Sequence, residues 1–164
     1  MAKQLLAEQV RWVSGIAPIA GGSARSGDWI SLKGYEGVMI LVHIAMGHAA
    51  TTAITVDKAT AVAGTGNSDA ITLAHAWKRT GALGGAPTWT AVTPATSITS
   101  SATGSGEDQF IIDIPASELG DYDCVQVELG ASNSANIVSA EYILYGPRYS
   151  GPVTDGFTVD ATVD

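Results

Sequence analysis

Apolar and polar residues alternate along much of the chain between residues 25 and 149, with the two-residue period that is typical of β-strands. The clearest runs lie at 53–59, 124–129 and 137–145. The run at 37–45 is apolar on both sides, which predicts a central strand covered on both faces. Further short runs lie at 29–33, 70–77, 88–92, 96–99 and 109–114. This series of eight or nine short strands predicts an all-β fold, an antiparallel β-sandwich or jelly roll.

The two ends of the chain lack this alternation. Residues 1–24 are predicted to be an N-terminal arm, in which residues 3–13 form a short helix or an extended segment. Pro18 and the glycines of residues 15–23 disfavour a helix in the second half of that arm. The sandwich domain is assigned to residues 25–149, and residues 150–164 are predicted to be an extended acidic tail.

The connections also carry predictions. Residues 79–87 are rich in glycine and are predicted to be a mobile loop. Residues 115–119 predict one helical turn, ended by Gly120. The short polar loop at 131–136 predicts that the strands on either side of it, 124–129 and 137–145, form an antiparallel pair.

Charge and composition exclude several classes of function. Eight Lys and Arg residues against 16 Asp and Glu give a formal net charge of −8. The basic residues are scattered, so we expect no nucleic-acid partner and no binding to anionic membranes. No apolar run is long enough to span a bilayer, and we expect a soluble protein that is synthesised in the host cytoplasm.

Candidate catalytic and metal-binding residues are few. His43, His48 and His75 lack the close spacing of a metal site. Asp121 and Asp123 form an Asp-x-Asp pair, but the further oxygen ligands of a calcium loop are missing. The single cysteine, Cys124, is interpreted as a small apolar strand residue, since its near neighbours in the sequence are acidic. We therefore expect no cofactor, no metal and no enzymatic activity.

The aromatic residues give a more specific signal. Trp29 and Tyr142 are interpreted as core residues. Trp12 lies on the predicted arm, and Tyr149 lies at the C-terminal end of the predicted domain, so both flank the predicted sheet. Aromatic side chains in such positions are typical docking anchors. The predicted protein interface consists of these two and three further residues near the chain ends: Leu5, Leu6, Trp12, Arg148 and Tyr149.

Three segments resemble small proteins of tailed bacteriophages that are encoded beside the major capsid protein. These are residues 54–66, Ile-Thr-Val-Asp-Lys-Ala-Thr-Ala-Val-Ala-Gly-Thr-Gly; residues 123–130, Asp-Cys-Val-Gln-Val-Glu-Leu-Gly; and residues 139–149, Ser-Ala-Glu-Tyr-Ile-Leu-Tyr-Gly-Pro-Arg-Tyr. The resemblance covers about residues 25–150 and includes no catalytic motif.

The resemblance implies a structural virion protein that decorates and cements the capsid by bridging major capsid protein subunits at the capsid surface. It also implies a homo-oligomer, expected to be a trimer. The alternative function is a receptor- or glycan-binding module of a phage head or tail fibre, with Trp77 and Trp89 as candidate sugar-stacking residues.

Overall fold

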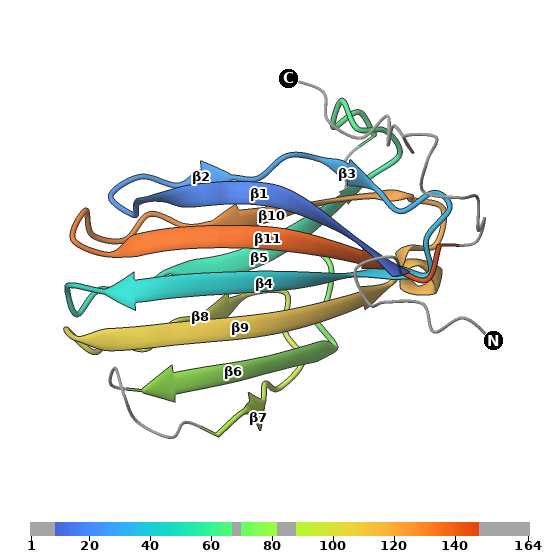
Figure 1. The fold of residues 1–164 in the computed structure, drawn as a ribbon. Coiled ribbons are helices and arrows are strands. Elements are labelled where there is room, and N and C mark those ends of the chain that lie inside the picture. The colour runs from blue at the N-terminus through green and yellow to red at the C-terminus, as the bar shows by residue number, and fades with distance from the viewer. Residues whose placement is uncertain (1–8, 67–69, 82–87, 148–164) are drawn as a thin grey trace.

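The computed structural model describes residues 9–66, 70–81 and 88–147, and these form two antiparallel β-sheets packed face to face (Figure 1). The larger sheet has the strand order β1-β11-β4-β9-β6-β7, and the smaller has the order β2-β10-β5-β8, with β3 also paired to β10. The strands and the one short 3-10 helix have these bounds: β1 Val10–Ala20, β2 Arg25–Ser26, β3 Ile30–Ser31, β4 Gly37–Met46, β5 Ala53–Ala59, β6 His75–Gly81, β7 Thr90–Ala91, β8 Ile98–Thr99, β9 Gly106–Pro115, η1 Ala116–Leu119, β10 Cys124–Leu129 and β11 Ile137–Tyr145.

The chain crosses between the two sheets at nearly every connection. β1, β4, β9 and β11 lie in the larger sheet, whereas β2, β3, β5, β8 and β10 lie in the smaller one. This alternation is the strand arrangement of a jelly roll. The pair β6–β7, inserted between β5 and β8, extends the larger sheet beyond β9. The predicted all-β antiparallel sandwich is therefore confirmed.

The core lies between the sheets and follows the predicted alternation. Every second residue of β4, from Val38 to Ile44, is buried against the strands of the smaller sheet. Each such Val or Ile contributes about 1.5–3 kcal/mol through its removal from water. Tyr142 of β11 crosses the core, where its hydroxyl donates to the Asp28 carbonyl at 3.0 Å and accepts from the Val127 amide at 2.9 Å. These two bonds tie the larger sheet to segments of the smaller one.

Residues 10–20 are not part of an arm but form β1, an edge strand of the larger sheet. Val10 pairs with Tyr145, and the pairing continues with register shifts after Ser14 and Ile16. Gly15 permits the first shift, because a Cβ atom there would lie 2.7 Å from the ring of Tyr142. Gly15 and Pro18 interrupt the alternation of this strand, so its pattern in the sequence is weak. An edge strand tolerates both residues because one of its sides is unpaired.

The predicted pairing of 124–129 with 137–145 is wrong. β10 lies in the smaller sheet and β11 in the larger, so the loop between them crosses the sandwich. Buried Asn136 fixes this crossing, since its side-chain oxygen accepts from the amides of Gly47 and His48 at 2.9 and 2.8 Å. The β4–β5 turn that contains those amides also passes from one sheet to the other.

Two further predictions require correction around β6. The strand predicted at 70–77 begins only at His75, and it continues to Gly81, into the predicted loop 79–87. The polar end of β6 is a strand because it pairs with the polar end of β9, where Arg79 lies opposite Gln109. The rest of that loop, residues 82–87, lies outside the described residues.

The helical turn predicted at 115–119 is present as η1, and Gly120 follows it with a φ of 67°. No helix in the described part of the chain is long and apolar enough to cross a membrane.

Candidate functional site

The outward side of the larger sheet carries an unusual concentration of apolar and aromatic side chains. β4 was expected to be covered on both faces, yet among the described residues no element packs over its outward side, where Met39 and Leu41 are half-buried. Cross-strand register places further residues on the same side. We call this surface the aromatic face; it comprises Trp12, Met39, Leu41, His43, Trp77, Trp89, Glu107, Gln109, Ile111, Ser139, Glu141 and Ile143.

Trp12 is the most exposed aromatic side chain of this face. It lies on the edge strand β1, opposite Ile143 of β11, and its exposed fraction is 58%. Its indole Nε1 donates a hydrogen bond of 2.6 Å to Oε2 of Glu141. The Trp12 side chain is thus oriented by a partner 129 residues away in the sequence and still presents most of its surface to solvent.

Trp77 and Trp89 lie at the opposite edge of the aromatic face, with exposed fractions of 38% and 40%. Trp77 faces outward from β6, and Trp89 directly precedes β7. Beside Trp89 the surface is hollowed by an open depression of about 450 Å³. We call it the Trp89 depression; its lining residues are Leu41, Val42, His43, Trp89, Gln109, Phe110, Ile111, Ser139 and Glu141.

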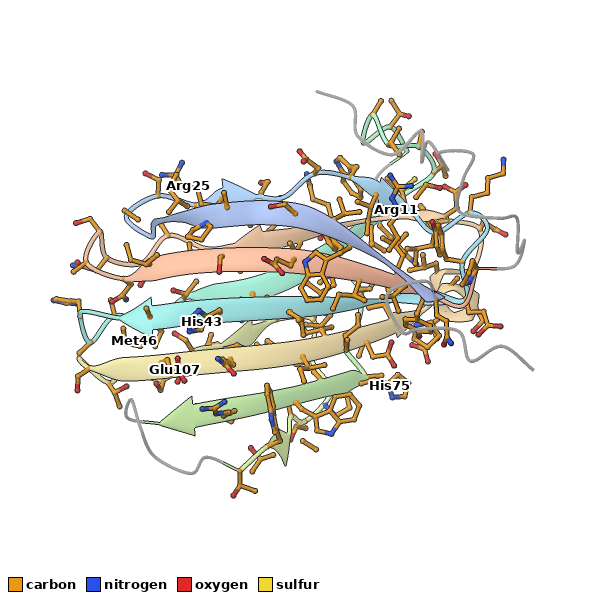
Figure 2. All side chains as sticks on the ribbon, in the orientation of Figure 1. Arg11, Arg25, His43, Met46, His75 and Glu107 are labelled. Atoms are coloured by element: carbon orange, nitrogen blue, oxygen red, sulfur yellow. The ribbon has the colours of Figure 1, made fainter. Side chains whose placement is uncertain are left out.

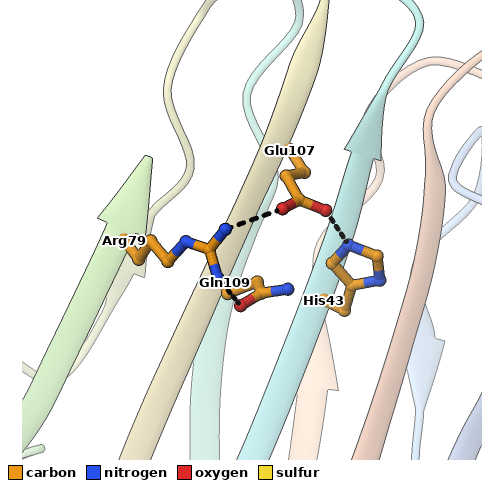
Figure 3. A network of polar contacts seen from close by, with 4 residues as sticks. All are labelled: His43, Arg79, Glu107 and Gln109. Atoms are coloured by element: carbon orange, nitrogen blue, oxygen red, sulfur yellow. Dashed lines mark hydrogen bonds and ion pairs between the residues drawn. The ribbon is translucent and has the colours of Figure 1, made fainter. Parts of the chain in front are cut away.

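A polar network runs along one side of the Trp89 depression (Figure 3). The Glu107 carboxylate contacts His43 Nε2 at 3.0 Å through one oxygen and Arg79 Nη2 at 3.2 Å through the other. Arg79 also donates from Nη1 to the Gln109 side-chain oxygen at 3.2 Å. Because Glu107 and Gln109 alternate along β9 between Arg79 of β6 and His43 of β4, cross-strand register alone brings the four side chains together.

The other two histidines do not join this network. Figure 2 shows His43 and Glu107 on adjacent strands near one end of the sheet, whereas His75 lies near the other end. His75 contacts Glu118 of η1 at 3.0 Å, and His48 lies in the turn after β4. Among the residues that the structure describes, no group of three or more His, Cys, Asp or Glu side chains is arranged to hold a metal ion.

Cys124 lies on the outward side of the smaller sheet but is buried. Burial, together with the adjacent Asp123 carboxylate, raises the pKa of the thiol to about 12. Asp123 accepts from the sulfur at 3.1 Å. A nucleophilic cysteine needs the opposite shift, so this geometry does not activate the thiol.

Of the five residues predicted to form a protein interface, Trp12 is the one that the structure describes. Leu5, Leu6, Arg148 and Tyr149 lie outside the described residues. Val10, the first residue of β1, pairs with Tyr145, the last residue of β11, so these two strand ends lie side by side, next to Trp12.

The other aromatic predictions had mixed outcomes. Tyr142 is a core residue, whereas Trp29 is half-buried and packs near Gly64 rather than in the core. The outward apolar residues Met39, Leu41 and Ile111 were not predicted from the sequence. The signal for Met39 and Leu41 was the continuous apolar run of β4, which was interpreted as a sign of a second covering layer, whereas Ile111 lies in the apolar run 110–112 of β9.

Comparisons with known proteins return distant similarities. No family model matches the chain, and no curated protein matches it. The crystal structure of the SPBc2 prophage-derived protein YomS superposes with a TM-score of 0.46 and 10% sequence identity, covering 89% of this chain and 99% of that one. A Desmodium yellow mottle tymovirus structure gives a TM-score of 0.16 at 10% identity, covering 93% of this chain and 97% of that one. Similarity at this distance transfers no function to the chain.

Proposed function

We propose that this chain is a structural protein of a bacteriophage virion that decorates the head and stabilises it by binding major capsid protein subunits. The proposal combines the sequence resemblance of residues 54–66, 123–130 and 139–149 with the exposed Trp12 on an edge strand. The exposure of Trp12 is the observation that carries the proposal, because a large aromatic ring held in place yet open to solvent is typical of an interface anchor.

The position of Trp12 suits a bridging role. We propose that Leu5, Leu6, Arg148 and Tyr149 contribute to a capsid-binding surface together with the paired ends of β1 and β11. Segments that extend from a folded domain reach across subunit boundaries and add contacts without changing the domain itself. A protein that binds only the assembled lattice stabilises that lattice by mass action.

We propose that the chain acts as a homotrimer on the outer capsid surface and catalyses no reaction. The raised pKa of the Cys124 thiol agrees with the absence of a nucleophilic role for that residue.

Sedimentation with purified heads tests the proposal. Wild-type protein is expected to co-sediment saturably with expanded heads that lack it and not with unexpanded proheads. Trp12→Ala should weaken binding about 10- to 100-fold, which corresponds to about 1–3 kcal/mol for the loss of an anchor. Trp77→Ala, a matched change at the other edge of the same face, should leave binding within about twofold. Unchanged binding of Trp12→Ala, or the absence of the chain from mature virions, would reject the proposal.

The terminal segments need truncations that leave the sheet intact. Removing residues 1–14 would delete half of β1, whereas removing residues 1–8 leaves every described strand complete. The shorter deletion should retain the wild-type unfolding temperature and lose capsid affinity through the absence of Leu5 and Leu6. Ending the chain after Pro147 tests Arg148 and Tyr149 in the same way. Full affinity in both truncated proteins would restrict the interface to the folded domain.

A further inference from the structure

The Trp89 depression combines an apolar floor, an aromatic wall and a polar rim. Leu41 and Ile111 contribute apolar surface from neighbouring strands β4 and β9, and Trp89 is two-fifths exposed beside them. His43, Gln109 and Glu141 supply hydrogen-bonding groups around the same space. The volume of about 450 Å³ falls within the usual range of small-molecule sites, about 300–1,000 Å³.

Hydrogen bonds fix the rim before any ligand arrives. Arg79 holds the side-chain oxygen of Gln109, so the amide NH₂ of Gln109 is the group left to donate to a ligand. Trp12 binds Oε2 of Glu141, so Oε1 is left as an acceptor. His43 is held through Nε2 by Glu107, which directs its other ring nitrogen away from that carboxylate. A rim with fixed side chains loses little conformational entropy when a ligand binds.

We infer that the Trp89 depression binds one pyranose ring of a neutral saccharide. A pyranose has a flat face of C–H groups, which the electron-rich face of an indole attracts, and a ring of hydroxyls, which need both donors and acceptors. The depression offers Trp89 for the flat face, Gln109 as a donor and Glu141 as an acceptor. A purely apolar ligand would leave the rim groups desolvated and unpaired, which disfavours its binding.

The charges around the depression favour neutral sugars over acidic ones. Glu107 and Glu141 both lie on the aromatic face, and Arg79 is already paired with Glu107. The whole chain has a net charge of −8, which also repels anionic ligands. Neutral hexoses and N-acetylhexosamines are therefore the expected class, and sialylated or uronate-terminated glycans are disfavoured.

This binding activity goes beyond attachment to the head and does not depend on it. Five inter-strand spacings separate β1 from β7, which places Trp12 and the segment of Trp89 on strands about 24 Å apart. Glu141 nevertheless adjoins both, because it lines the depression and also accepts from Trp12 Nε1. The head contact therefore has to lie on the β1 side of Trp12 for the depression to stay open, and a virion with many such copies would then bind surface saccharides with high avidity.

The test uses the full-length protein on an array of immobilised glycans that includes neutral, N-acetylated, sialylated and uronate-terminated members. The best-bound neutral terminal sugar is then titrated as its methyl glycoside while tryptophan fluorescence is recorded. We expect Trp89→Ala to weaken binding at least tenfold and Gln109→Ala about three- to tenfold. Trp89→Tyr should retain most of the affinity, since it keeps an aromatic face.

Trp77→Ala is the matched control, because Trp77 has nearly the same exposure on the same face but does not line the depression. It should change saccharide affinity less than twofold. Failure to bind any neutral glycan, a preference for acidic glycans, or equal effects of Trp77→Ala and Trp89→Ala would overturn the inference. Head binding by Trp89→Ala, measured by sedimentation, separates the two activities: it should be unchanged, whatever the outcome on the array.

Discussion

Both outer faces of the sandwich consist of the outward residues of strands in which buried and outward residues alternate. The two faces differ in the side chains that they carry. The outward residues of β5 and β10 include Thr55, Asp57, Gln126 and Glu128. Gln126 donates to the Gly27 carbonyl at 2.6 Å, and Glu128 accepts from Ser26 at 3.2 Å. The aromatic face instead presents Trp12, Trp77 and Trp89 to solvent.

The difference between the two outer faces indicates that the core stabilises the fold, whereas the aromatic face serves binding. Both sheets bury the same kinds of Val, Ile and Leu side chains on their inner sides, so the core does not require an apolar surface outside it. A group of exposed aromatic residues on one outer face is not needed to form the core and is typical of a binding surface. The polar outer face of the smaller sheet is that of an ordinary solvated sheet.

Chemical labelling of thiols should give the largest contrast between the two faces. Cys124 on the polar side is buried, and a pKa of about 12 leaves little thiolate at pH 8. In a Cys124→Ser background, Trp12→Cys places a thiol on the open edge of the aromatic face. We expect the introduced thiol to react with an aromatic disulfide reagent more than about 100-fold faster than native Cys124.

Denatured samples of both proteins provide the control for labelling, since their thiols should react at similar rates. The raised pKa of the Cys124 thiol also makes the free energy of unfolding depend on pH. The folded-state pKa of Cys124 lies above its unfolded value, so its contribution to stability is complete below about pH 8.5 and is lost as the pH rises toward 12. Rapid labelling of native Cys124 at pH 8 would show that the polar face opens, and would contradict the burial seen here.

Removing the hydrogen bonds that the Tyr142 hydroxyl makes to segments of the smaller sheet should have the next largest effect, which is on the free energy of unfolding. Tyr142→Phe deletes the hydroxyl that binds the Val127 amide and the Asp28 carbonyl. Losing both bonds in the interior should cost about 1–3 kcal/mol in the free energy of unfolding, measured by urea denaturation. Tyr145→Phe removes one bond, to Asp113, from a less buried ring and should cost less. Equal losses in the two variants would mean that the Tyr142 hydroxyl has no special role in joining the faces.

The sequence predicted the strands whose signal is local. The runs 53–59 and 124–129 coincide with β5 and β10, because each alternates cleanly and is bounded by turn residues. β1 was missed because Gly15 and Pro18 interrupt its pattern, and their tolerance depends on the ring of Tyr142 and on an edge position. Neither condition is visible within residues 10–20.

The candidate site was less predictable than the fold because its contacts are distant in sequence. Trp12 could be selected as an exposed anchor from its residue type, but its bond to Glu141 joins positions at opposite ends of the chain. A short loop joins strands equally well within one sheet or across a sandwich, so the pairing of β10 with β11 was misjudged. The Trp89 depression depends on the true order, which places β9 between β4 and β6.

The polar network on the aromatic face should have the smallest effect on stability. His43 is about half exposed, and its pair with Glu107 is therefore screened by water. His43→Ala should lower the free energy of unfolding by less than about 1 kcal/mol, and His75→Ala, which breaks a similarly exposed pair with Glu118, should do the same. The two variants should differ in saccharide binding, which only His43→Ala is expected to weaken, because His43 lines the Trp89 depression. A loss of stability above about 2 kcal/mol in His43→Ala alone would exceed the contribution of an exposed ion pair and would show that the network supports the fold. The aromatic face would then contribute to stability as well as to binding.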